Sequence, residues 1–353
     1  MAVTRVTYVT REEVKEAMDV KLSARNDPQI DISIEAASET VEGLLHRKFY
    51  PEITTKYVDW PNFQSTYPWK IYLDAAELAD VTSIVPTVTS GGNVIDPSTI
   101  FWGNPRYAPP YTYFELNRAS SSSFGQGDTP QRDVGITGIF HFWNKTTPAG
   151  ALALAMTDTT STTAQITNSA AVGVGDNILV DSERLLVQDR AMVSTGQTQV
   201  SGATTKDSTD VSLTTSGGTF SVGEVLLLDS ERMKITDIGA TLTVIRGWEG
   251  TVLATHTSAT IYAPRLLTVE RGALGTTAAT HLIGATVNRA LYPGLVKELA
   301  LAEAVVDMRQ RVGGWSSVQG SGQSKVVNIG AGLPDLRDRC YTAYGRKARQ
   351  RAV

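Results

Sequence analysis

Two pairs of matching segments recur in the middle of the chain, and their order constrains the fold more than any other feature. VGDNILVDSERLLV (174–187) matches VGEVLLLDSERMKI (222–235), and LTVIRGWEGTVLATH (242–256) matches LTVERGALGTTAATH (267–281). In tandem modules each first half would be followed by its own second half, whereas here both first halves come before both second halves. The order therefore predicts one small β module (203–263) nested inside another copy of itself (151–200 with 265–291).

Helical segments lie on both sides of this repeat. Thr10, with Glu13 three residues later, predicts a capping box that starts a first helix. Apolar residues at spacings of three and four predict a second helix within 30–49, with one apolar stripe formed by Ile34, Ala37, Val41, Leu44, Leu45 and Phe49. The segment 295–312 is apolar on two sides, so we expect it to pack against the second helix and against another subunit.

Residues 54–143 contain short runs of β-branched and aromatic residues separated by turn-forming residues, which is typical of strands. The expected fold class is therefore α+β. A helical core with short antiparallel strands is predicted for 1–150 and 291–353, including a C-terminal arm at 313–353. An inserted all-β region of two related small modules is predicted for 151–290.

Composition limits the classes of function. The formal net charge of −4 argues against a general nucleic-acid coat protein, although it does not exclude a local basic patch. Cys340 is the single cysteine, which excludes an internal disulfide and a cysteine zinc site. The first residues lack the apolar segment of a secretory signal, and no apolar run is long enough to span a bilayer, so we expect no membrane association.

Paired carboxylates are the clearest candidates for catalysis, because glycosidases use two of them. Asp181 with Glu183 and Asp229 with Glu231 are such pairs in the sequence. Their recurrence in two related hairpins favours polar residues at hairpin tips instead.

Histidine and glycine patterns point to no reactive site. His256 and His281 occupy the same place in the repeat and lack further ligands at metal-binding spacing, so they are expected to be structural. His46 and His141 are isolated and receive no role. No glycine-rich phosphate loop lies between a strand and a helix. The sequence therefore predicts no enzyme, no cofactor and no metal.

The C-terminal arm holds the candidate interface. A Gly/Ser-rich segment is interrupted by KVVNI (325–329), which predicts either an edge strand added to a partner sheet or a plain linker. The basic helix that begins at Pro334 predicts contact with DNA phosphates, contact with an acidic protein surface, or a solvated terminus. The candidate interface residues are Lys325, Val326, Val327, Ile329, Arg337, Arg339, Arg346, Lys347 and Arg349.

Five blocks together resemble the head–tail connector, or adaptor, proteins of long-tailed bacteriophages. They are EAASETVEGLLHRKFYP (35–51), WKIYLD (69–74), GITGIFHFW (135–143), LVKELALAEAVVDMRQR (295–311) and LPDLRDRCYTAYGR (333–346). The resemblance covers about residues 1–150 and 291–353, so the helical core corresponds to a connector core. The long insertion departs from the simple pattern, and its role is not implied.

The resemblance implies a virion protein, assembled in the host cytoplasm into a ring of about twelve copies at the head–tail interface. The ring would join the portal protein to a tail or stopper protein, and DNA would pass through its lumen during ejection without sequence-specific binding. The candidate interface residues would meet the portal or a neighbouring subunit. The alternative function is a carbohydrate- or receptor-binding tail protein built on the repeated modules. It requires exposed aromatic residues, for which Trp248 and Tyr262 are almost the only candidates.

Overall fold

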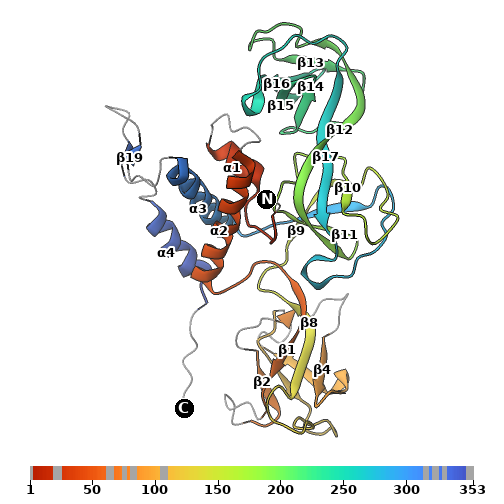
Figure 1. Cartoon of the computed structure of the whole chain (residues 1–353). Coiled ribbons are helices and arrows are strands. Elements are labelled where there is room, and N and C mark those ends of the chain that lie inside the picture. Colours follow the sequence, from red (N-terminus) through yellow and green to blue (C-terminus); the bar gives the residue numbers. More distant parts are fainter. Residues whose placement is uncertain are drawn as a thin grey trace. The chain divides into compact units, whose positions relative to one another are not determined.

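The structure is a computed structural model of the chain. It describes residues 3–18, 26–60, 67–73, 78–79, 86–103, 110–312, 318–319, 326–327 and 332–346. Contacts divide it into two compact units (Figure 1): Met1–Arg47 with Lys145–Ala273 and Thr277–Val353, and Lys48–Asn144 with Leu274–Thr276. Within the described ranges, no helix is long and apolar enough to cross a membrane.

The predicted helical core is wrong, because the protein is mostly β. Of the residues that the structure describes, 36% lie in strands and 23% in helices, and the strands form large antiparallel sheets. The long apolar stripes of the helices give a strong sequence signal, whereas short strands give a weak one. The sequence therefore led to an overestimate of the helical share of the fold. The helices are α1 (Arg11–Met18), α2 (Asp27–Leu45), α3 (Gly294–Val312) and α4 (Leu333–Tyr344).

The ends of the first two helices follow from local chemistry. The predicted capping box is confirmed, since the Glu13 N–H donates to Thr10 Oγ1 at 3.3 Å and the Thr10 N–H donates to a Glu13 carboxylate oxygen at 3.2 Å. α2 begins with Pro28 in its first turn and ends at His46, which has a left-handed backbone conformation. The residues after His46, predicted to form the last turn of this helix, therefore lie beyond it.

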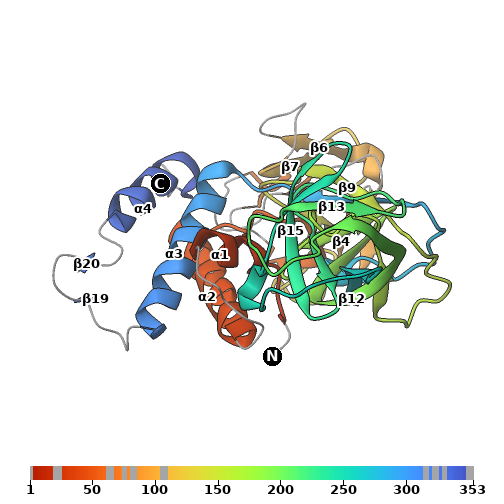
Figure 2. The ribbon, with the colours of Figure 1, turned by 90° about the horizontal axis from the view of Figure 1, so that it is seen from above.

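Helices α2 and α3 pack against each other although 248 residues separate the end of one from the start of the other (Figure 2). The fully buried stripe of α3 consists of Val296, Leu299, Ala300, Ala304 and Met308. Ser33 Oγ of α2 donates to Asp307 of α3 at 2.6 Å. The prediction that the end helices meet is confirmed. α3 also contacts α1 and α4, so neighbours from its own chain cover more of it than the sequence suggested.

The repeat folds into two closed β-barrels in which every strand pairing is antiparallel (Figure 1). Barrel A follows the order β9-β18-β11-β12-β17-β10 and closes through the backbone bridge between Leu152 and Ile166. Barrel B follows the order β12-β13-β16-β15-β14-β17 and closes through the β12–β17 pairing. The strands are β9 (Thr146–Ala151), β10 (Thr163–Gln165), β11 (Asn177–Val180), β12 (Glu183–Gly202), β13 (Ser212–Thr215), β14 (Val225–Leu228), β15 (Glu231–Ile238), β16 (Leu242–Ile245), β17 (Thr260–Glu270) and β18 (Thr286–Ala290).

The same register recurs in the two barrels. Val180 pairs with Glu183 in barrel A as Leu228 pairs with Glu231 in barrel B, so the prediction of two Asp-Ser-Glu hairpin tips is confirmed. β15 and β16 of barrel B are joined by a short turn, whereas the corresponding parts of β12 and β17 in barrel A continue into barrel B. Barrel B therefore stands where barrel A would have a hairpin turn, which explains the order of the repeated halves.

Each barrel has its own apolar core. The larger members are Leu152, Ile166, Ile178 and Leu185 in barrel A, and Leu213, Leu226, Met233 and Ile261 in barrel B. Contacts place the terminal helices in the same compact unit as both barrels. The predicted division into 1–150 with 291–353 and 151–290 concerns which parts fold alone, and it stays a prediction.

The second unit contains two further antiparallel sheets around a separate core that includes Ile71, Phe114 and Ile136. One has the order β1-β8-β4-β5 with β3 also on β8, and the other has the order β2-β7-β6. The strands are β1 (Glu52–Val58), β2 (Lys70–Tyr72), β3 (Leu78–Ala79), β4 (Thr87–Ser90), β5 (Asn93–Val94), β6 (Ile100–Gly103), β7 (Tyr113–Leu116) and β8 (Val134–Phe140). In the C-terminal arm, β19 (Val318–Gln319) pairs with β20 (Val326–Val327).

Two adjacent leucines of α2 test the helical packing. Leu45 is fully buried, whereas Leu44, which the sequence placed on the same stripe, is only half-buried. We expect Leu45→Ala to lower the free energy of unfolding by about 2–5 kcal/mol, because a buried leucine leaves a cavity. Leu44→Ala should cost clearly less. Urea unfolding of both variants measures the difference, and equal losses would contradict this packing.

Candidate functional site

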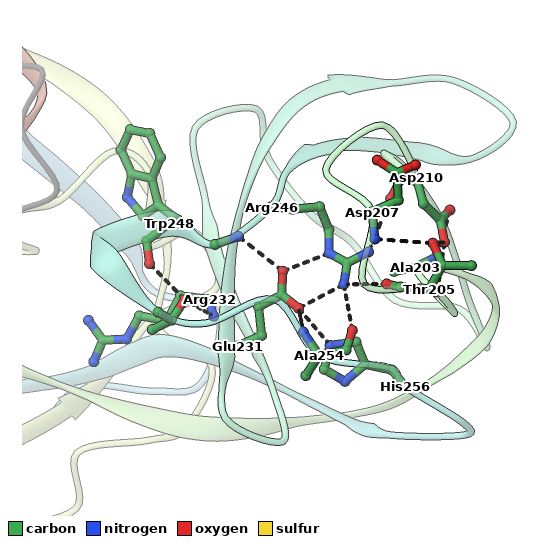
Figure 3. Close-up of polar contacts among 12 residues, drawn as sticks. Ala203, Thr205, Asp207, Asp210, Glu231, Arg232, Arg246, Trp248, Ala254 and His256 are labelled. Carbon is green, nitrogen blue, oxygen red and sulfur yellow. Dashed lines mark hydrogen bonds and ion pairs between the residues drawn. The ribbon is translucent and has the colours of Figure 1, made fainter.

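Each barrel buries a glutamate completely at the first position of the strand that follows its Asp-Ser-Glu hairpin tip. In barrel B this is Glu231, the first residue of β15 (Figure 3). Arg246 donates to both of its oxygens, from Nε at 2.6 Å and from Nη2 at 2.7 Å. The N–H groups of Gly247 and Ala254 donate at 3.0 and 2.8 Å, and His256 Nε2 lies 3.1 Å away. The carboxylate therefore has a partner on every side.

Barrel A repeats this arrangement around Glu183, the first residue of β12. Arg271 donates to its two oxygens at 2.8 and 2.9 Å. The N–H groups of Gly272 and Ala279 each donate at 2.9 Å, and His281 Nε2 lies at 2.9 Å. We call each set a glutamate cluster. The two clusters use the same residue types at the same repeat positions, so the repeat preserves one local arrangement in both barrels.

The glutamate clusters join three sequence elements that recur in the repeat: Asp-Ser-Glu, Arg-Gly and Ala-Thr-His. The aspartates of the first element have left-handed backbones (φ 51°) at the hairpin tips and remain exposed. The sequence correctly placed both carboxylates at a hairpin but did not show that the glutamates point inward. The signal that could have shown it is the joint recurrence of all three elements, since a buried carboxylate needs a buried cation.

The hydrogen bonds of the glutamate clusters favour the ionised form of each carboxylate. Burial alone would raise the pKa of Glu231, but the hydrogen bonds from Arg246, Ala254, His256 and Gly247 outweigh it and lower this pKa to about 2. The same balance, with Arg271 as the main donor, lowers the pKa of Glu183 to about 2. A carboxylate with so low a pKa is a poor general acid or base near neutral pH.

The two repeat histidines belong to these clusters. The second ring nitrogen of His256 lies 2.8 Å from Asp229, and that of His281 lies 2.7 Å from Asp181. Each imidazole thus bridges an exposed and a buried carboxylate, and both contacts are made at once when both nitrogens carry protons. No group of side chains that could hold a metal ion occurs in the part of the chain that the structure describes.

A cleft of about 680 Å³ lies between α1 and the two barrels. Its lining carries the cations Arg11, Lys15, Arg190, Arg232, Lys234 and Arg289 and the anions Glu12, Glu13, Glu16, Asp27, Asp189 and Glu249. The two sets are equal in number, so the lining has no net formal charge.

Most charges of the cleft are used in ion pairs that connect α1 to the barrels. Glu13 of α1 pairs at 2.7 Å with Arg289 of β18, whose Nε also pairs at 2.9 Å with the buried Asp176. Burial raises the pKa of Asp176 to about 6, although Arg289 opposes the rise. Glu16 pairs at 2.7 Å with Lys234 of barrel B. The cleft therefore lies between segments of one chain that ion pairs hold together, and its charges neutralise one another.

Neither aromatic candidate for sugar binding forms an open platform. Trp248 lines the cleft and is half-buried, with the Lys234 ammonium 4.7 Å from its ring centroid. Tyr262 is exposed on β17, but it is a single ring. Nothing among the described residues of the barrels therefore favours the carbohydrate-binding alternative.

Three of the predicted interface residues, Arg337, Arg339 and Arg346, lie on α4 or just after it. Arg337 of α4 binds Glu303 of α3 through two hydrogen bonds, at 2.6 and 2.9 Å, and these bonds raise the pKa of Arg337. Arg339 is exposed and has no partner within the described part of the chain. The N–H of Arg346 donates to the carbonyl of Leu45 at 3.0 Å.

The remaining predicted interface residues precede α4 in the chain or follow Arg346. Val326 and Val327 form β20, which pairs with β19 of the same chain. The other four fall outside the described residues: Lys325, Ile329, Lys347 and Arg349.

Neither a protein-family model, nor a curated protein, nor a solved structure matches this chain.

The glutamate cluster of barrel B can be tested by its dependence on pH. The pKa of Glu231 in the folded protein, about 2, lies below its ordinary value of 4.5. Its ionised form therefore stabilises the fold above pH 4.5, and this stabilisation is lost as the pH falls toward 2. Glu231→Gln should remove that part of the acid dependence and cost about 3–5 kcal/mol at pH 7, because it leaves Arg246 buried without a counter-charge.

Asp229→Asn is the matched control, because the Asp229 carboxylate is exposed and asparagine tolerates a left-handed backbone. It should cost less than about 1 kcal/mol. Urea unfolding of both variants and the wild type at pH 7 and pH 3 measures the effects. Equal stability of the two variants at pH 7 would show that the buried pair does not hold the barrel.

Proposed function

We propose that the protein is a virion structural protein that forms a ring adaptor between the portal vertex of a phage head and the tail, with a lumen through which DNA passes. The observation that carries the proposal is the packing of α2, α3 and α4. Three of the sequence blocks that resemble connector proteins overlap these helices. They are distant along the chain, yet they pack together as a common helical group.

The arrangement of the insertion is compatible with the role of a ring adaptor. Both barrels are formed by one continuous stretch of the chain, from β9 to β18. α3 begins four residues after β18 ends. The helical group is therefore completed by the chain on either side of the insertion. The chain can therefore carry this insertion without losing the contacts among α2, α3 and α4.

The chemistry of the described residues also favours a structural role. The buried carboxylates of Glu183 and Glu231, candidates for catalysis in the sequence, are fully engaged in hydrogen bonds, and most charges of the cleft are paired. A net charge of −4 suits a channel through which DNA must slide, because a strongly cationic surface would hold the phosphates.

The helix α4 supplies a cation for contact with another protein. Arg339 faces solvent, whereas Arg337, two residues earlier, is bound to Glu303 of the same chain. An exposed cation with no partner among the described residues is available to a carboxylate on a portal or a neighbouring subunit. A cation already in an ion pair contributes to the fold instead.

Ring formation is the direct test of the proposal. Purified full-length protein should form closed particles of about twelve copies with a central channel, since closed rings arise from repeated head-to-tail contacts. Mass photometry gives the copy number and negative-stain images give the shape. Protein that stays monomeric at every concentration and fails to bind DNA-filled heads would overturn the proposal.

Charge reversal at the two α4 arginines separates docking from folding. Arg339→Glu should leave the melting temperature unchanged and weaken attachment to portal-bearing heads, with an effect that shrinks as salt is added. Arg337→Glu is the matched control and should lower the melting temperature, because it places a carboxylate beside Glu303. Sedimentation of heads with bound protein measures attachment. Full attachment by Arg339→Glu at low salt would remove α4 from the docking surface.

A further inference from the structure

Barrel A carries an aliphatic patch that its own fold does not bury. The patch consists of Leu154, Leu282 and Ile283, with exposed fractions of 57%, 80% and 66%. We call these three residues the barrel A patch. Single exposed aliphatic residues are ordinary, but several together mark a surface that contacts something else.

Backbone hydrogen bonds place the patch residues side by side. The N–H of Gly284 donates to the carbonyl of Leu152, and the N–H of Met156 donates to the carbonyl of His281, both at 2.9 Å. Leu154 lies midway between Leu152 and Met156, and the other two patch residues lie between His281 and Gly284. The three side chains therefore occupy one end of the barrel, on two neighbouring segments.

Barrel B provides an internal comparison, because it has the same fold. The N–H of Leu152 donates to the carbonyl of Ala285, the residue before β18, and the N–H of Gln199 donates to the carbonyl of Ala259, the residue before β17, both at 2.9 Å. Leu152 and Gln199 are therefore equivalent. Two residues further on, barrel A has Leu154 and barrel B has the exposed Ser201. The fold therefore does not require an aliphatic residue at this position.

The second segment differs in the same direction. After the equivalent histidines, His256 and His281, barrel B continues with Thr257 and Ser258, both exposed. Barrel A has Leu282 and Ile283 there, followed by one additional residue, Gly284. Every patch position is thus polar in one barrel and aliphatic in the other, while the glutamate clusters are the same. A surface requirement specific to barrel A accounts for this difference.

The chemistry of the patch limits what can cover it. The segments 153–157 and 279–285 contain no lysine, arginine, aspartate or glutamate and no aromatic residue. Nucleic acid would require cations, and a sugar would require aromatic faces or a polar pocket. Two copies of the chain can meet here without placing like charges opposite each other.

The size of the patch also favours a second copy. Three such side chains expose on the order of 300 Å² of apolar surface, the size of the largest patch on many monomers. A stable interface between free partners buries roughly 800 Å² on each side. The patch is therefore too small to hold a partner alone, but it can strengthen the contact between copies that other surfaces already keep together.

We propose that the barrel A patch is a contact between copies of this chain in its assembled state. The inference rests on the proposed function to the extent that the copies must assemble. It assigns to the insertion a role that the helical group does not supply: barrel A of one copy adds an apolar contact to the next copy.

The test replaces the patch with residue types that barrel B carries. The triple variant Leu154→Ser, Leu282→Thr, Ile283→Ser should keep the wild-type melting temperature, since the changed side chains are exposed. Its assembly midpoint in sedimentation velocity should move to at least about tenfold higher concentration. The matched control is Val252→Thr, because Val252 is 82% exposed on barrel B and barrel A has Thr277 at the equivalent position. It should assemble as the wild type does.

A cross-link identifies the occupant. With p-benzoylphenylalanine in place of Leu282, irradiation of the assembled state should give covalent dimers of the chain, because this group reacts with whatever side chain of the next copy lies against it. The same replacement of Val252 should not. Assembly of the triple variant at the wild-type concentration, or no dimer after irradiation of the Leu282 variant, would overturn the inference and leave the ring proposal intact. Particles that depend on the patch but are not rings would support the inference and overturn the ring. Wild-type protein that never assembles would overturn both.

Discussion

The buried glutamate–arginine pair is the interaction on which each barrel depends. Glu183 and Glu231 are removed from water at the start of a strand, and each is compensated by a two-pronged arginine, two backbone N–H groups and a histidine. A buried charge is tolerated only with such compensation. The pair thereby ties the first half of each repeat to the second half, although in barrel A the two halves are separated by the whole of barrel B.

This tie explains how one barrel can lie inside another. Barrel A is interrupted where a short turn would join its two central strands, and β12 and β17 continue outward to form part of barrel B. An insertion at that point does not disturb the glutamate cluster, because the cluster lies at the opposite, hairpin end of the strands. The insertion is therefore tolerated without loss of the glutamate cluster in barrel A.

Comparison of the two barrels also distinguishes residues that the fold requires from exposed residues that it does not require. The residues of the glutamate clusters are the same in both barrels, whereas the three patch positions differ, with leucine and isoleucine in barrel A and serine and threonine in barrel B. Two copies of one fold in one chain thus act as controls for each other. At these three positions the fold itself does not require an aliphatic residue.

The sequence by itself determined the nested repeat, the hairpin tips, the capping box at Thr10 and the buried residues Ile34, Ala37, Val41 and Leu45 of α2, because each depends on residues that are close together or on matched strings. Only the tertiary structure decided that the protein is mostly β, that Glu183 and Glu231 point inward, and that α1 is joined to the barrels by ion pairs. It also decided which arginine of α4 forms an ion pair, since Arg337 meets Glu303 and Arg339 is exposed. The physical reason is the same throughout: burial and charge pairing depend on partners that are distant in the chain, and no local pattern identifies them.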